Sequence, residues 1–224
     1  MVYVTGDLHG EYERFTKTAI RKLRKNDVLF VCGDFGFLWN GGKKEAKILN
    51  KIGKKRFHTV FVTGCHDNYA LLRQYPEEEW CGGKVRAISG NLKQLCRGEI
   101  YTVEGKTFFA FGGGESSSSV SIEDNPYWWP EEQPTPEEEA YAFEKLASVG
   151  NRVDYIITHE TSVSLCEFLN IPPADVNSRI NNFLEKIGKT VEFKQWFFGK
   201  FHQDKAITGK QRAVYLQVVP VKES

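Results

Sequence analysis

Five polar clusters, all containing His or Asp, each follow directly after a short apolar run in this chain of 224 residues. The apolar runs are β-branched or aromatic, which predicts strands: Val2 to Thr5, Val28 to Cys32, Val60 to Thr63, Tyr155 to Ile157 and Trp196 to Phe198. The clusters that follow them are Gly6 to Gly10, Gly33 to Gly36, Gly64 to Asn68, Thr158 to Glu160 and Gly199 to His202. Open α/β sheets hold their ligands at the carboxyl ends of their strands. The pattern therefore predicts an α/β fold with these clusters gathered at one edge.

The residue types in the clusters indicate a metal site. Asp and His offer oxygen and imidazole ligands, a mixture that suits Mn²⁺, Fe²⁺ or Zn²⁺ better than Ca²⁺. A glycine before each ligand lets the backbone turn sharply out of the strand. Any one Gly-Asp pair is more often an ordinary turn, and a lone His is more often structural. Five clusters in one context favour a common function over coincidence.

In their order, the clusters resemble the motifs of the calcineurin-like metallophosphoesterases. That family shows Gly-Asp-x-His, then Gly-Asp, then Gly-Asn-His-Asp/Glu, then a lone His, then Gly-His-x-His, and this chain follows that order from residue 6 to residue 202. The resemblance implies a four-layer α/β/β/α sandwich of two mixed sheets flanked by helices, with residues 1–224 as a single domain. Trp128-Trp129 and Trp196 to Gly199 further resemble segments of the small phosphoesterases of Gram-positive bacteria and their mobile elements.

The resemblance also implies a role for each matched residue. His66 would contact the scissile phosphate and help to protonate the leaving group, and Asp67 would orient the His66 ring. Asp34 would be the carboxylate that bridges two ions. The remaining implied ligands are Asp7, His9 and His202 for the first metal and His159 for the second.

Two positions depart from the family pattern, and both fall on the second metal. Cys65 stands where the family has Asn, and Lys200 stands where it has His. A protonated lysine has donors only and repels a cation. A Cys65 thiolate would instead complete a second site with Asp34 and His159, whereas a neutral thiol would not. We therefore expect one metal site, with the second in doubt, and a slower enzyme in which Lys200 acts as a replacement cation on the phosphate.

The implied activity is the metal-dependent hydrolysis of phosphomonoesters or phosphodiesters, in which a metal-activated water attacks phosphorus. A nucleotide, a phosphoprotein or a nucleic-acid end would each supply such an ester. The alternative is a catalytically impaired protein that binds phosphate or a partner on a phosphoesterase scaffold. The predicted ligands would contact only the phosphate group, so they do not indicate which of these substrates the protein hydrolyses.

Composition and net charge indicate which binding partners and which cellular compartment to expect. The net charge of +1 gives no global attraction to nucleic acid or to an acidic membrane, and we interpret the basic series from Lys43 to Arg56 as a solvated helix face. Five cysteines without Cys-x-x-Cys spacing indicate reduced thiols in the cytoplasm. The first strand begins at Val2, which leaves no room for a signal peptide, and no apolar stretch is long enough to span a bilayer.

Gly112 to Pro136 is a long segment without clear periodicity. We interpret it as a rim over the metal site that stacks on a base or aryl group of the substrate. The alternative is that Trp128 and Trp129 pin the segment to the core.

Periodicity and turn residues predict the remaining helices and strands. We predict helices over Glu11 to Arg24, Lys43 to Lys55, Thr135 to Gly150 and Asp175 to Ile187, and strands over Val85 to Ile88, Ile100 to Val103, Lys106 to Phe111, Lys205 to Thr208 and Ala213 to Val219.

Overall fold

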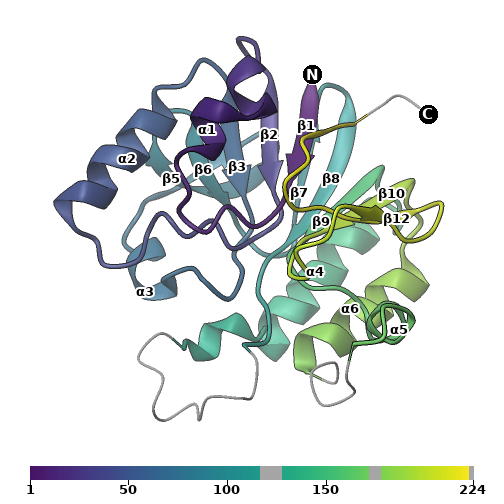
Figure 1. Cartoon of the computed structure of the whole chain (residues 1–224). Coiled ribbons are helices and arrows are strands. Elements are labelled where there is room, and N and C mark those ends of the chain that lie inside the picture. Colours follow the sequence, from purple (N-terminus) through teal and green to yellow (C-terminus); the bar gives the residue numbers. More distant parts are fainter. Residues whose placement is uncertain (117–127, 172–177, 222–224) are drawn as a thin grey trace.

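The structure, a computed structural model, contains two mixed β-sheets packed face to face and flanked by helices (Figure 1). It describes residues 1–116, 128–171 and 178–221. The first sheet has the order β13-β1-β2-β3-β6-β5-β4, formed by Val219–Pro220, Val2–Thr5, Val28–Val31, His58–Phe61, Leu92–Leu95, Gly83–Ser89 and Glu77–Trp80. The second has the order β11-β12-β10-β9-β8-β7, formed by Lys205–Ala206, Gln211–Ala213, Gln195–Phe198, Tyr155–Thr158, Lys106–Phe111 and Glu99–Val103.

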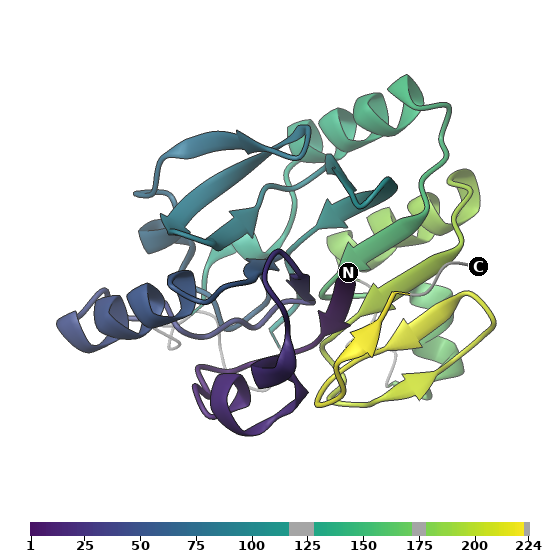
Figure 2. The same cartoon turned by 90° about the horizontal axis from the view of Figure 1, so that it is seen from above.

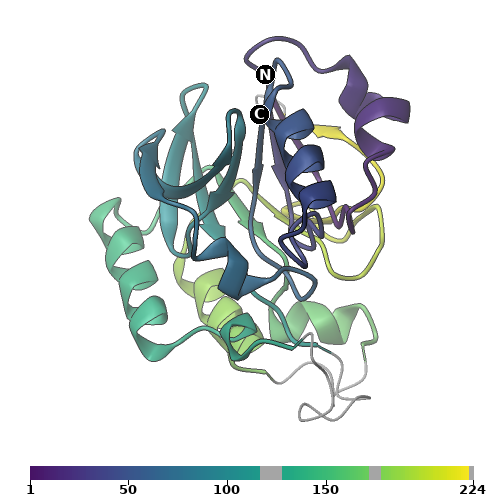
Figure 3. The same cartoon turned by 90° about the vertical axis from the view of Figure 1, so that its left-hand side faces the viewer.

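The helices lie on the outer faces of the two sheets. On the first sheet these are α1 (Arg14–Lys17), η1 (Ala19–Lys22) and α2 (Lys43–Gly53), and α2 faces the viewer in Figure 3. On the second sheet they are α4 (Pro136–Ser148), α5 (Val163–Phe168) and α6 (Arg179–Thr190). The short helices α3 (Tyr69–Leu72) and η3 (Pro130–Glu132) belong to connecting segments.

Three apolar clusters separate the layers, and strand alternation explains them. Phe30 packs with Phe108 and Phe197 between the sheets, whereas its neighbour Leu29 packs with Ile52 under α2. A third cluster lies between the second sheet and the helices α4 and α6. Successive strand residues point to opposite faces, so each central strand contributes to two layers. The four-layer arrangement, seen from above in Figure 2, confirms the predicted fold class.

Several element predictions are confirmed. Thr135 caps α4, since its hydroxyl accepts the Glu138 N–H at 3.2 Å and the Glu138 carboxylate accepts the Thr135 N–H at 2.9 Å. The predicted strands on either side of Glu104 and Gly105 pair as β7 and β8, and these two residues make a tight turn with φ of 52° and 72°. Strand β8 has the predicted bounds. Among the described residues no helix combines the length and apolar character needed to cross a membrane.

Other element predictions are wrong. The predicted helix from Glu11 to Arg24 breaks at Thr18, whose extended φ of −106° and ψ of −172° separate α1 from η1. The predicted strand from Ala213 to Val219 is divided, because β12 belongs to the second sheet and β13 pairs with β1 in the first. Strands β4 and β6 were not predicted. The helix predicted from Asp175 to Ile187 is present as α6, which Ser178 caps and which begins at Arg179, and its predicted start lies outside the described residues.

Candidate metal centre

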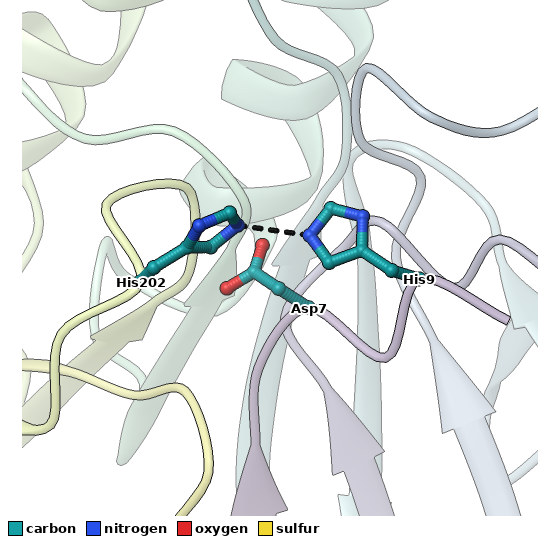
Figure 4. A group of neighbouring side chains, drawn as sticks. All are labelled: Asp7, His9 and His202. Carbon is teal, nitrogen blue, oxygen red and sulfur yellow. Dashed lines mark hydrogen bonds between the residues drawn. The ribbon is translucent and has the colours of Figure 1, made fainter. Parts of the chain in front are cut away.

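The loop after β1 and the loop after β10 bring three ligands together (Figure 4). Asp7, His9 and His202 each offer one ligand atom, and these atoms lie within 4.8 Å of one another. The His9 Nε2 and His202 Nε2 atoms are 2.8 Å apart. Both rings are partly or fully exposed, whereas Asp7 is buried. A mixed carboxylate and imidazole group open to solvent on one side can bind a catalytic metal.

Asp34, after β2, lies between this group and two further histidines. Its Oδ2 atom is 3.8 Å from His9 Nε2 and 2.8 Å from His66 Nδ1, and its Oδ1 atom is 3.4 Å from His159 Nε2. Asp34 is only 3% exposed. A buried carboxylate with both oxygens directed at different imidazoles has the position expected of a bridging ligand.

A second ligand group contains Asp34, Cys65 and His159, all buried. Lys200 reaches into it from the loop after β10. The Lys200 ammonium donates to Cys65 Sγ at 3.2 Å and pairs with Glu160 Oε1 at 3.0 Å, and it also contacts the Glu115 carbonyl oxygen. The cationic side chain therefore lies where the resemblance led us to expect a second metal.

The electrostatics of the site follow from burial and from these pairings. Burial raises the pKa of Asp7 to about 7. Burial also acts to raise the Asp34 pKa, but His159 and His66 outweigh it and hold that pKa well below its usual range. Burial raises the pKa of the Cys65 thiol well above its usual value, so the sulfur is neutral. Burial alone would lower the Lys200 pKa, but Glu160 raises it, so the side chain stays charged.

Two buried polar atoms at the centre have no hydrogen-bond partner among the described residues. They are Asp7 Oδ2 and His159 Nε2. Unpaired buried polar atoms are rare and costly in folded proteins. Asp7 belongs to the first ligand group and His159 to the second, and a carboxylate oxygen and an imidazole nitrogen are both ordinary ligands of a divalent transition metal. The donor set therefore fits a metal ion.

The backbone at the site is strained. Asp7, His9, Asp34, Lys200 and His202 have φ between 35° and 67°, a left-handed region that residues with a Cβ rarely adopt. Such strain is concentrated at functional sites. The left-handed turn is thus made largely by the ligand residues themselves.

The glycines before the ligands chiefly provide space. A Cβ on Gly33 would lie 2.3 Å from His159 Nδ1, and one on Gly64 would lie 2.2 Å from Asp34 Oδ1. The predicted need for a sharp turn holds at Gly33, where φ is 85°, but Gly6, Gly64 and Gly199 are not among the residues with positive φ. At those three positions close packing of the strand ends excludes a side chain.

Asp67 binds backbone groups of two loops, and its role in orienting His66 stays a prediction. Its two oxygens accept the backbone N–H groups of Phe35, Gly36 and Gly64 at 3.4, 3.0 and 2.9 Å respectively, so among the described residues it makes no hydrogen bond to the His66 ring. The ring of His66 is held by Asp34 instead. Asp67 is buried, and its pKa is raised to about 6 by that burial. It fixes the loops after β2 and β3 against each other.

Sequence reasoning missed three contributors to the site. Glu160 neutralises Lys200, and its place beside His159 in a ligand cluster was the available signal. Arg14, which is buried, donates to Tyr215 O at 2.7 Å and to Thr5 Oγ1 at 2.9 Å, and so supports the Asp7 loop. Trp39 lies nearly parallel to His66, with ring centroids 6.4 Å apart.

The predicted rim is only partly described. Residues 117–127 of the segment from Gly112 to Pro136 lie outside the described residues. Trp129 packs edge-on against Trp39 with ring centroids 5.3 Å apart and also lies near Tyr69. Trp129 is partly exposed. At least one aromatic residue of the predicted rim therefore borders the site.

The chain is similar to known proteins in two comparisons. Two solved structures are weakly similar: the protein of unknown function AQ665 from Aquifex aeolicus (14% identity, TM-score 0.38, 72% of this chain and 79% of that chain covered) and phosphopantetheinyl hydrolase (PptH) from Mycobacterium tuberculosis (14% identity, TM-score 0.39, 96% and 89% covered). A search of curated proteins found no match. Residues 1–199 match the model of the calcineurin-like phosphoesterases. The chain belongs to the calcineurin-like phosphoesterase family.

Proposed function

We propose that the protein hydrolyses phosphate esters with one tightly bound transition-metal ion. The observation that carries this proposal is the convergence of Asp7, His9 and His202 beside Asp34. These four residues would hold the ion, for which Mn²⁺, Fe²⁺ and Zn²⁺ are the candidates. When bound, the ion would neutralise phosphate charge and lower the pKa of a water molecule.

In the proposed reaction His66 assists the leaving group. Its side chain is 60% exposed at the mouth of the site, and its Nδ1 atom is anchored on Asp34 at 2.8 Å. The hydrogen bond to Asp34 raises the His66 pKa, which favours the protonated ring. A proton held on an accessible imidazole beside the ligand group supports a role as general acid.

Lys200 takes the place of a second ion in this proposal. Its side chain is 24% exposed, and its ammonium is fixed by Glu160 and Cys65. A fixed cation in a largely buried site stabilises negative charge that develops on a phosphate oxygen. A single positive charge replaces a divalent ion here, so we expect slower turnover than a two-metal site would give.

The same lysine supports the alternative function. With Lys200 on Cys65, the second ligand group is occupied by a protein cation. A site of this kind can bind phosphate or a partner without turnover.

We further propose a cytoplasmic location, in keeping with five free cysteines. The single domain over residues 1–224 stays a prediction.

Turnover of an aryl phosphate monoester and an aryl phosphodiester with Mn²⁺ distinguishes the two functions. We expect the unmodified protein to hydrolyse these substrates. A chelator should abolish this activity, and the Asp34→Asn variant should lack it. Asp27→Asn is the matched control, because Asp27 is a buried aspartate at the opposite end of β2. Phosphate binding without any turnover would favour the alternative, and chelator-resistant hydrolysis would contradict both.

A further inference from the structure

The charge of the protein is divided unevenly along the chain. Residues 14–56 contain thirteen Lys and Arg but three Asp and Glu, a net charge of +10. The whole chain has a net charge of +1, so the other residues together carry −9. The small net charge is therefore the sum of a strongly basic segment, residues 14–56, and an acidic set of all other residues. Local charge, more than net charge, decides what a surface attracts.

Eleven of these cations form one surface, which we name the basic face. Arg56 Nε donates to Leu23 O at 2.9 Å, and the Asn26 N–H donates to Arg56 O at 3.0 Å, so the end of α2 adjoins the segment around η1. Figure 3 shows α2 on the outside of the first sheet. All members are exposed except Lys55, which is half-buried: Arg21, Lys22, Arg24, Lys25, Lys43, Lys44, Lys47, Lys51, Lys54, Lys55 and Arg56.

Within the described part of the chain, the cations of the basic face have no acidic partners. None of them forms an ion pair with any other residue that the structure describes. The one acidic residue of α2, Glu45, directs its carboxylate to the N–H groups of Trp39, Asn40 and Gly41 at 2.8–3.0 Å. Several lysines elsewhere form ion pairs, as Lys189 does with Glu185. Uncompensated charge of this size repels itself, and a polyanion would relieve that repulsion.

The basic face adjoins the candidate metal centre through the loop that carries Trp39. Glu45 holds this loop against the first turn of α2, and Asn68 Nδ2 donates to Trp39 O at 2.8 Å. The Trp39 ring, partly exposed, lies 25° from parallel with His66, and Trp129 supports it edge-on. The Trp39 ring is therefore held in place between the basic face and His66, the proposed general acid.

We infer that the basic face binds single-stranded nucleic acid, and that this is the substrate class of the site. Lys43, Lys47 and Lys51 repeat about every 6 Å along the axis of α2, which suits a linear polyanion. A base at the end of the strand would stack on Trp39, which a duplex would not allow. The described exposed large apolar residues, Met1, Val149, Phe168 and Leu216, lie outside the basic face, so it lacks a membrane anchor. The substrate assignment rests on the proposed function, but the binding surface does not.

Binding of a fluorescein-labelled oligothymidylate of about 12 nucleotides, followed by anisotropy at several salt concentrations, tests the proposal. The variant K43Q/K47Q/K51Q should reduce the salt slope by about 2 and the affinity roughly 50-fold at about 0.15 M salt, if each lysine contacts a phosphate. Trp39→Leu should weaken binding roughly tenfold with an unchanged slope. K186Q/K189Q/K194Q removes the same charge around α6 and should change the affinity by less than about twofold.

Equal losses from both triple variants, or binding of anionic phosphatidylserine vesicles without binding of the oligonucleotide, would overturn the inference. K43R/K47R/K51R keeps the positive charge and should retain the wild-type salt slope. This variant tests the role of charge even if K43Q/K47Q/K51Q does not fold. The titrations are made with Mn²⁺ and again with chelator, because the basic face contains none of the proposed metal ligands. Retained binding without hydrolysis would reject the proposed function alone.

Discussion

The paired substitution Cys65→Asn with Lys200→His should create a second metal site. Lys200 Nζ lies 3.2 Å from Cys65 Sγ and 3.0 Å from Glu160 Oε1, so the ammonium stands beside any ion bound by Asp34, Cys65 and His159. The substitutions remove this cation and supply an amide oxygen and an imidazole, both of which ligate divalent metals. The first ligand group is left intact.

The magnitude follows from these distances. An ion about 2.3 Å from the Cys65 sulfur would lie at most about 5.5 Å from Nζ. At an effective dielectric constant of about 20, its repulsion from the ammonium is about 6 kcal/mol. Glu160 attracts the ion equally before and after the substitutions, so its contribution cancels from the comparison. Loss of the ammonium alone therefore strengthens binding by about 6 kcal/mol, roughly 10⁴-fold, before the effect of ligands lost or gained.

Calorimetric titration with Mn²⁺ and elemental analysis after desalting measure the result. We expect one ion in the unmodified protein, two in the double variant with faster turnover, and a partial gain in Lys200→His. Cys81→Asn with Lys194→His makes the same changes at exposed positions and should leave the stoichiometry at one. Two ions in the unmodified protein would refute the reasoning and make Cys65 a thiolate ligand. A double variant that gains neither metal nor rate would refute it as well.

Three further predictions concern the supporting structure. His66→Ala should retain metal and stability but lose turnover, most with poor leaving groups; equal wild-type rates on activated and unactivated esters would exclude the proposed role. Gly64→Ala should lower Mn²⁺ affinity at least roughly tenfold, because its Cβ would lie 2.2 Å from Asp34 Oδ1, whereas Gly209→Ala, with open space around the Cβ, should not. Arg14→Met removes the hydrogen bonds that the buried guanidinium donates to Tyr215 O and Thr5 Oγ1 and should lower the free energy of unfolding by about 2–3 kcal/mol in urea denaturation, and a loss below about 0.5 kcal/mol would contradict that account.

The sequence predicted the strands that carry the ligands because each is short, apolar and followed by glycine or a polar cluster. Strand β6 escaped prediction because Lys93 and Gln94 interrupt its apolar pattern, although all four of its residues are buried. Strand β4 begins with three exposed glutamates and lies at the edge of its sheet. The break at Thr18 depends on its extended backbone, which periodicity does not reveal.

The site shows the same limit. Motif order brought Asp7, His9, Asp34, His159 and His202 to one place, but the partners of each side chain depend on how loops from different strands meet. Asp67 is an example, since its acceptor atoms face backbone N–H groups of the loop after β2 as well as its own. The pairing of Lys200 with Glu160 likewise joins two loops that the sequence separates by forty residues.

Anomalous diffraction at the manganese edge, from crystals of the unmodified protein grown with Mn²⁺, tests the central claim most directly. The account predicts one strong peak, ligated by Asp7, His9, Asp34 and His202, with Lys200 still paired to Glu160. A peak between Asp34, Cys65 and His159, or no peak within reach of Asp7 and His202, would contradict it.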